Sequence, residues 1–182
     1  MKKNGIRSVV AIGIGTALFI VLSYVAIPTG IPNTSIQTRV ALLGFISAIF
    51  GPVVGCAVGL LGHALADALQ YGSVWWSWVF PEGVAGLLIG LFAARYKIEE
   101  GGFGGKQIVL FNVVQVIANA LAWILIAPVL DILIYAEPSN KVFTQGAVAC
   151  AFNIVAVGVI GSLLAVAYSK IKSKSSSLSK EN

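Results

Sequence analysis

Ionisable, amide and indole side chains interrupt the long apolar segments of this sequence, where such groups are costly and mark candidate functional sites. His63 and Asp67 are four residues apart, so they share one face if their segment is helical. Glu82 lies in the next apolar segment, and Asn119 and Trp123 lie four residues apart in the one after it. Carboxylates and amides hydrogen-bond the edge of a small polar ring, and indoles stack on its faces. These residue types therefore predict a pocket for a small ring compound.

Plainer interpretations of the same residues stay open. His63 and Asp67 could simply pair with each other, since residues at this spacing meet on a helix surface. Asp131 and Lys141 could form an ordinary loop salt bridge. Trp78 follows two other tryptophans in a short aromatic loop, and tryptophan is typical of the headgroup level of a membrane.

The elements that must position these residues are membrane helices. Hydrophobic residues make up 58% of the 182-residue chain and charged residues only 10%, with a mean hydropathy of +0.92. Soluble domains carry roughly a quarter charged residues. Twelve basic and seven acidic residues cannot cover a folded chain of this length, so lipid must solvate most of its surface.

The apolar runs predict an all-α integral membrane bundle of six transmembrane helices, at about 9–27, 39–50, 53–69, 78–94, 107–127 and 142–168. One domain, residues 1–170, holds all six, and the Lys- and Ser-rich tail 171–182 is expected to be disordered and cytoplasmic. Residues 28–38 read as an outer loop, and residues 131–141 as a second outer connection. Pro128, just before the second connection, is expected to break or kink its helix.

The placement of the basic residues orients this bundle. Ten of the twelve fall before the first helix, in the middle loop 95–106, or in the tail, and an even number of crossings puts these segments on one side. Because basic loops stay in the cytoplasm, both termini are expected there. The basicity therefore sets orientation and does not indicate nucleic-acid binding. In this topology the polar candidates all lie in the outer half of the bundle, namely Asp67, Glu82, Asn119, Trp123 and Gln145.

Small residues on the first helix suggest a second function. Ala11 and Gly15 form a small-xxx-small pair, which lets helix backbones approach closely in lipid and could dock another membrane subunit. The sequence contains no phosphate-binding loop, no His/Cys metal cluster and no nucleophile elbow, so we expect neither an enzyme nor a metal or cofactor. Polar groups confined to the outer half favour capture of a solute over a complete path across the membrane.

These features resemble the substrate-binding S components of energy-coupling factor (ECF) vitamin transporters, over nearly the whole chain from Val9 to Tyr168. The resemblance includes the six helices, the Ala11–Gly15 element and the loop that leads to Arg39. Three further segments are similar to the riboflavin-type branch, which includes proteins assigned to hydroxymethylpyrimidine or pyridoxine uptake, and they cover residues 27–33, 72–78 and 127–138.

The resemblance implies a small vitamin captured at the outer face of the bacterial cell membrane, with the first outer loop and its Asn33 closing over it. A coupling membrane subunit, met through Ala11 and Gly15, and two ATPase subunits would complete the importer. The ring would stack on Trp123 and a belt residue such as Trp78, while its edge would hydrogen-bond to Asp67, Glu82, Asn119 and Gln145.

Two rival hypotheses remain. One is a free-standing carrier in which His63 and Asp67 relay a proton coupled to uptake. The other is a structural or membrane-interaction protein without a ligand.

Overall fold

The computed structural model describes residues 2–30 and 34–178, and their regular structure is helical except for one short β-hairpin. Two segments, η1 and η2, are π-helical turns within longer helices. The elements in chain order are α1 (Lys2–Ser23), β1 (Ala26–Pro28), β2 (Ser35–Gln37), α2 (Arg39–Phe50), α3 (Pro52–Tyr71), α4 (Trp76–Gly90), α5 (Ala93–Tyr96), α6 (Gly105–Asn119), η1 (Ala120–Ile126), α7 (Ala127–Tyr135), α8 (Ser139–Ala156), η2 (Val157–Gly161) and α9 (Ser162–Leu178).

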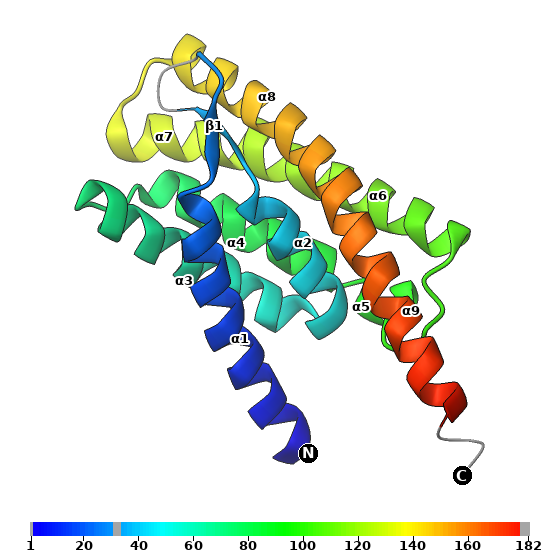
Figure 1. The fold of residues 1–182 in the computed structure, drawn as a ribbon. Coiled ribbons are helices and arrows are strands. Elements are labelled where there is room, and N and C mark those ends of the chain that lie inside the picture. Colours follow the sequence, from blue (N-terminus) through cyan, green and yellow to red (C-terminus); the bar gives the residue numbers. More distant parts are fainter. Residues whose placement is uncertain (1, 31–33, 179–182) are drawn as a thin grey trace.

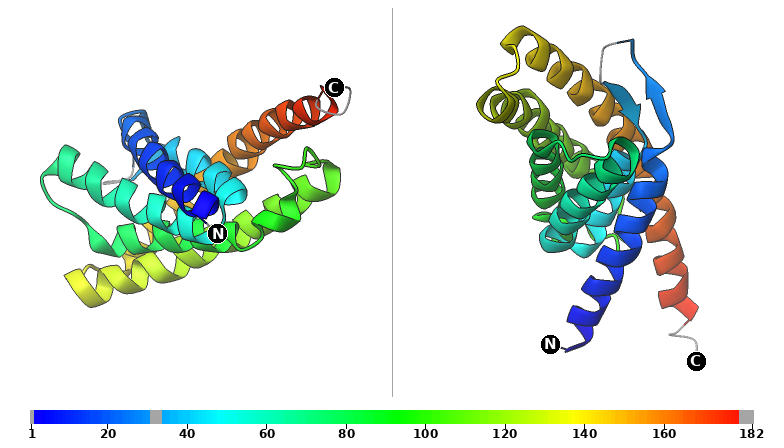
Figure 2. Two further views of the ribbon diagram at one scale, coloured as in Figure 1. Left: turned by 90° about the horizontal axis from the view of Figure 1, so that it is seen from below. Right: turned by 90° about the vertical axis from the view of Figure 1, so that its left-hand side faces the viewer.

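The hairpin and the chain termini lie at opposite ends of the molecule (Figure 1). We call these the hairpin end and the termini end. The views in Figure 2 show α1 and α9 projecting together toward the termini end, while the other helices form the body of the bundle. The first turns of α1 and the last turns of α9 therefore lie on one side of the molecule.

Four helical segments within the described residues are long and apolar enough to cross a membrane, namely Gly5–Ser23, Pro52–Tyr71, Gly105–Tyr135 and Ser139–Ser175. The apolar α2 has only 12 residues and α4 has 15, fewer than the ~20 that a straight span requires. The chain is thus an all-helical, membrane-type protein, and the count of six spans stays a prediction.

The connection between α1 and α2 differs from the loop predicted for residues 28–38. α1 ends at Ser23, and Ala26–Pro28 pairs antiparallel with Ser35–Gln37, with Ile27 opposite Ile36. Pro28 has no backbone N–H, but it lies on an edge, where a strand tolerates proline. The Thr38 hydroxyl lies 3.2 Å from the Val25 carbonyl oxygen and donates to it, which ties the base of the hairpin together.

Pro128 does not break its helix, although a break was one of the two outcomes expected from the sequence. The helix runs unbroken from α6 through η1 to the end of α7 at Tyr135. A proline ring clashes with the carbonyl of the preceding α-helical turn. That turn is widened here, since the Ala127 N–H bonds the Ala122 carbonyl five residues back. Asp131 consequently lies on a helix and not in the outer connection predicted for residues 131–141.

The termini end is held by an ion pair between distant segments. Arg7 of α1 donates two hydrogen bonds to Glu99, in the turn after α5, and one of them is 2.8 Å long. The Arg7 guanidinium lowers the pKa of the Glu99 carboxyl below its ordinary value. Nearby, α9 continues to Leu178, so the helix enters the segment 171–182 that was expected to be disordered.

Glycines allow α3 and α4 to pack backbone against backbone. A Cβ atom at Gly59 would lie 2.7 Å from the Glu82 carbonyl oxygen, and one at Gly86 would meet the Gly55 carbonyl oxygen. Real Cβ atoms do not approach so closely, so only glycine permits this separation of the two helices. The contact sets the position of Glu82 relative to α3.

Replacement of Gly59 should therefore destabilise the bundle. Gly59→Ala forces α3 and α4 apart, and overpacking of this kind costs about 1–3 kcal/mol. The midpoint of thermal unfolding in detergent measures the loss. Gly13→Ala is the matched control, because nothing lies within 4 Å of a Cβ there and the added methyl favours helix. Equal unfolding midpoints for the two variants would contradict the close packing.

Candidate binding site

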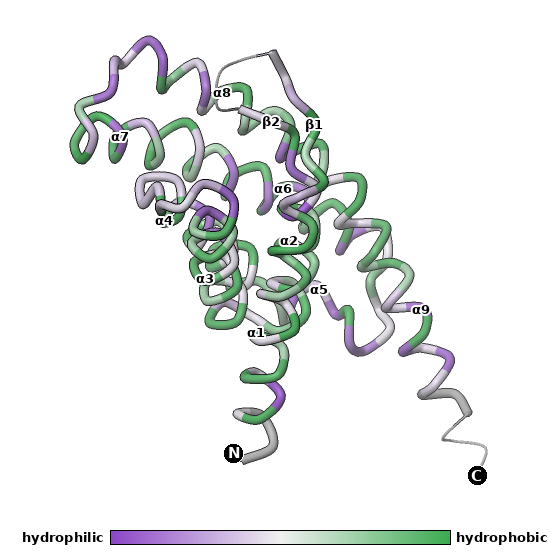
Figure 3. The backbone as a smooth tube through the Cα atoms, turned by 60° about the vertical axis from the view of Figure 1, so that its left-hand side comes forward, coloured by the Kyte–Doolittle hydropathy of each residue, from purple (hydrophilic) through white to green (hydrophobic). Residues whose placement is uncertain are grey.

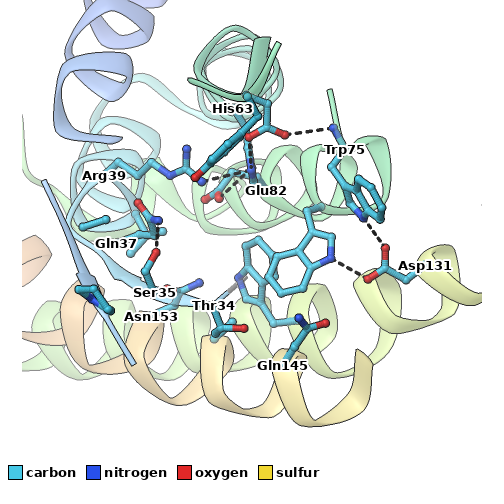
Figure 4. Close-up of a pocket in the computed structure, with 18 of the residues that line it drawn as sticks. Thr34, Ser35, Gln37, Arg39, His63, Trp75, Glu82, Asp131, Gln145 and Asn153 are labelled. Carbon is cyan, nitrogen blue, oxygen red and sulfur yellow. Dashed lines mark hydrogen bonds and ion pairs between the residues drawn. The ribbon is translucent and has the colours of Figure 1, made fainter. Parts of the chain in front are cut away.

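A cavity of about 760 Å³ opens at the hairpin end. Its walls come from the hairpin, α2, α3, α4, η1, α7 and α8. The close-up in Figure 4 shows polar side chains and indole rings directed into it from several of these elements. Pockets of roughly 300–1,000 Å³ suit small-molecule ligands.

Four charged or ionisable side chains form a cluster on one wall of the cavity (Figure 4). Arg39 Nη2, from the start of α2, lies 3.1 Å from His63 Nε2. Glu82 Oε2 lies 3.4 Å from His63 Nδ1, and Asp67 Oδ1 lies 3.5 Å from His63 Nε2. Exposed fractions are 7% for Arg39, 4% for His63, 6% for Asp67 and 2% for Glu82. The cluster is therefore almost fully removed from solvent.

The hydrogen bond from Arg39 assigns the tautomer of His63. A guanidinium N–H can only donate, so His63 Nε2 must accept. The ring proton then lies on Nδ1, where it faces Glu82 at 3.4 Å. His63 is neutral in this arrangement, and its Nδ1–H lies near Glu82 without completing a hydrogen bond. The contact between His63 and Asp67 is thus one part of a larger cluster, and not the isolated pair of the plainer interpretation.

Asp131 anchors the aromatic wall of the cavity. The Trp75 and Trp78 indole N–H groups each lie 2.7 Å from this carboxylate and donate to it. The Ser77 hydroxyl donates a third hydrogen bond. Trp75 also stacks on Tyr135 of α7, with ring centroids 4.2 Å apart. Asp131 therefore joins the start of α4 to α7 and does not pair with Lys141, which instead bonds Glu137 at 2.6 Å.

Trp123 comes from the π-helical segment η1. Its ring centroid lies 5.3 Å from that of Trp78, at 48° between the planes. The side chain is 2% exposed, and its Nε1 atom has no hydrogen-bond partner. α8 lies so close to this segment that a Cβ at Gly146 would meet the Trp123 carbonyl oxygen. The neighbouring residue Gln145 also lines the cavity.

The predicted site residues divide into three groups. Five line the cavity, namely Asp67, Trp78, Glu82, Trp123 and Gln145. Asn119 is not among the lining residues, since it is buried and its amide bonds the Gln115 carbonyl oxygen at 2.9 Å. Asn33 lies outside the described residues.

Three lining residues of clear chemical importance were not selected from the sequence. Arg39 stands alone at the start of a helix, with its partner His63 24 residues away, so no local spacing connects them. Asp131 and Trp75 are brought together only by folding, 56 residues apart in the chain. For Trp75 the run of tryptophans was the available signal, and it was equally typical of a membrane interface.

Ala11 and Gly15 lie on a second concave surface. A groove of about 520 Å³ between α1, α2 and α9 is lined by both residues. A Cβ at Gly15 would lie 2.9 Å from side-chain atoms of Ile46 and Val58, so Gly15 packs inward against α2 and α3. Gly5, Gly13 and Ala17 are exposed small residues of α1. The predicted coupling pair thus forms part of the floor of a groove and not a smooth outer face.

Comparison with known proteins identifies the family. The family described as the S component of the ECF-type riboflavin transporter matches residues 3–170. The chain belongs to this family. It is 58% identical over 176 residues to a UPF0397 protein of Exiguobacterium sp., with 96% of each chain covered. UPF0397 proteins of Lacticaseibacillus casei and Staphylococcus aureus are 53% and 52% identical, over 100% of this chain and 98% and 100% of theirs.

Membership in the S component family indicates the class of protein to which the cavity belongs. Its members are substrate-binding subunits of membrane transporters, and this is not a family of enzymes. No solved structure gives a significant match to the chain. The details of the site therefore rest on the residues described above.

Replacement of Asp131 tests the aromatic wall. Asp131→Asn puts an amide N–H against donors that need an acceptor, and an unsatisfied buried group costs about 1–3 kcal/mol. We expect a lower unfolding midpoint and stronger acrylamide quenching of tryptophan fluorescence. Glu137→Gln is the control, because it breaks only a partly exposed ion pair worth about 0–1 kcal/mol. Unchanged quenching in Asp131→Asn would show that this carboxylate does not hold the indoles.

Proposed function

We propose that this S component captures a small, water-soluble, ring-containing vitamin or vitamin precursor in the cavity. Hydroxymethylpyrimidine, pyridoxine and riboflavin are examples of this class. The observation that carries the proposal is a roughly 760 Å³ cavity in which two indoles meet buried polar groups with unused hydrogen-bonding capacity. Trp78 and Trp123 would stack on the ring, and Asp67, Glu82 and Gln145 would hydrogen-bond its edge.

We further propose that the cavity faces the outside of the bacterial plasma membrane. Both termini would then be cytoplasmic, and α2 and α4 would complete six spans. The clustering of basic residues near the termini and in the loop after α5 supports this orientation. Figure 3 shows largely hydrophobic helices, with hydrophilic stretches at the α7–α8 connection and around α5 toward the opposite end. A solute would reach the cavity without crossing the apolar body.

Coupling to ATP hydrolysis would come from partner subunits. The groove that contains Ala11 and Gly15 is mostly apolar, with Arg7 and Lys172 among its lining residues. It lies between α1 and α9, away from the cavity. An ECF coupling membrane subunit that docks there, together with two ATPase subunits, would leave the substrate site free.

The alternative of a proton-coupled carrier that acts alone receives less support. His63 already accepts from Arg39 and faces Glu82, so it is committed to the cluster. Deeper amides are used between helices, since Asn112 bonds Ser162 at 3.0 Å and Gln115 bonds the Ile154 carbonyl oxygen at 3.2 Å. Such interhelical bonds hold bundles together in lipid. They do not extend the cavity toward the termini end.

Mass spectrometry of gently purified protein should detect a bound ring compound, which tests the proposed function directly. Glu82→Gln should weaken binding of that compound by roughly tenfold or more in calorimetry, because hydrogen bonds to charged groups contribute about 1.5–3 kcal/mol. Glu100→Gln, an exposed carboxylate after α5, is the matched control and should bind normally. Equal affinity of both variants would remove Glu82 from the site, and absence of any small molecule would favour the structural alternative.

Liposomes that contain only this protein test the carrier alternative. With the released compound outside and an inward proton gradient, we expect binding at the membrane but no accumulation in the lumen. The control is the same preparation without a gradient. Gradient-dependent accumulation that is lost in His63→Gln would overturn the division of labour proposed here.

A further inference from the structure

The ionisable side chains around the cavity do not balance in charge. Among the described lining residues, Asp67, Glu82 and Asp131 are carboxylates, and Arg39 is the cation that opposes them. Glu137 and Lys141 also line the cavity but neutralise each other at 2.6 Å. His63 is neutral because it accepts from Arg39. With carboxylates and guanidinium ionised, the cavity wall carries an excess of two negative charges.

Glu82 accepts fewer hydrogen bonds than the other two carboxylates, since Asp67 accepts one from the Trp75 N–H. It is 2% exposed, and His63 Nδ1 approaches it to 3.4 Å without completing a hydrogen bond. Buried carboxylates are normally paired or held by several hydrogen bonds, because water no longer solvates them. Asp131, by comparison, accepts bonds from three donors. A cationic or N–H-bearing group in the cavity would supply what Glu82 lacks.

The indoles beside these carboxylates favour the same kind of ligand. The Trp78 N–H is directed to Asp131, so the edge of this indole is occupied and its ring face remains for a ligand. Trp123 lies against it at 5.3 Å between centroids. An indole face attracts a cation through its ring quadrupole, most strongly where water is excluded. Ring faces next to an uncompensated carboxylate are therefore suited to an organic cation.

Besides His63 Nδ1, two buried donors indicate what else the ligand must carry. Trp123 Nε1 and Arg39 Nε have no hydrogen-bond partner, and their side chains are 2% and 7% exposed. Both groups only donate, so they require an acceptor such as a hydroxyl, a carbonyl or an unprotonated ring nitrogen. An anionic ligand would satisfy them as well, but it would lie among three carboxylates that repel it.

We propose that the cavity selects a positively charged nitrogen heterocycle over a neutral or anionic one of the same size. The cationic group faces Glu82 and Asp67, the ring stacks against Trp78 and Trp123, and a polar acceptor on the ring meets Trp123 Nε1 or Arg39 Nε. This inference rests on the proposed function and names the charge class of its substrate.

Three compounds with one common ring test the charge preference. Pyridoxamine, pyridoxine and 4-pyridoxate share a pyridine ring and differ in a single substituent that is cationic, neutral or anionic. Binding to the purified full-length protein, freed of co-purified ligand, is followed by tryptophan fluorescence and calorimetry. We expect pyridoxamine to bind at least tenfold more tightly than pyridoxine, and 4-pyridoxate to bind most weakly.

The Glu82→Gln variant links any preference to the wall of the cavity. The ratio of pyridoxamine to pyridoxine affinity should fall severalfold in this variant and stay unchanged in Glu100→Gln. Thermal unfolding of both variants verifies that they are folded. Should Glu82→Gln not fold, Asp67→Asn replaces it, and the same fall in the ratio is expected. A preference that survives both substitutions would overturn the assignment to these carboxylates.

The remaining outcomes separate this inference from the proposed function. Pyridoxine or 4-pyridoxate binding as tightly as pyridoxamine would overturn the charge preference, while capture of a ring compound would stand. If none of the three binds, thiamine and riboflavin provide a larger cationic and a larger neutral ring. Binding of thiamine alone supports the inference, and binding of riboflavin alone overturns it. Failure of all five, with no co-purified molecule, would overturn the proposed function as well.

Discussion

The direct contact between the backbones of α3 and α4 is the constraint on which the cavity depends. Glycines at positions 55, 59 and 86 allow backbone atoms of the two helices to meet at this crossing. As a result His63 and Glu82, on different helices, come within 3.4 Å of each other. A side chain at the crossing would separate the imidazole from the carboxylate and leave two polar groups buried without compensation, which is costly in an apolar bundle. The contact that packs α3 against α4 thus also positions the polar side chains of the cavity.

An irregular stretch of helix positions side chains on the opposite wall of the cavity. The π-helical turn η1 accommodates Pro128 and carries Trp123, and Gly146 allows α8 to lie directly against it. Such turns are frequently found at functional sites, because they redirect side chains without ending a helix. Here the redirected side chain is an indole whose N–H group has no partner in the protein. One wall therefore carries the Arg39, His63, Asp67 and Glu82 cluster, and the other carries the indole rings with Asp131.

The sequence predicted the helices well and the cavity in part. Long apolar runs with proline and glycine at their ends are sufficient to locate membrane helices, and carboxylates within them stand out. The hairpin was not predicted, because strands of three residues are too short to show an alternating pattern. Asn119 and Trp123 were expected on one face from their spacing of four. The π-helical turn that begins at Ala120 changes the angle between successive side chains, so Trp123 lines the cavity and Asn119 does not.

The way in which the hairpin is attached has a mechanical consequence. Only Tyr24 and Val25 separate the end of α1 from β1, and Thr38 alone separates β2 from α2. α1 is also the least buried of the four long spans, with 11% of its apolar window inside the protein against 33–44% for the others. One side of α1 packs against α2 and α3, and the short link at its end joins any change in its tilt to the hairpin. Tilting of α1 at its Arg7 end would therefore move the hairpin, which forms one wall of the cavity. The width of the cavity mouth would then depend on the tilt of α1, although Arg7 lies at the termini end.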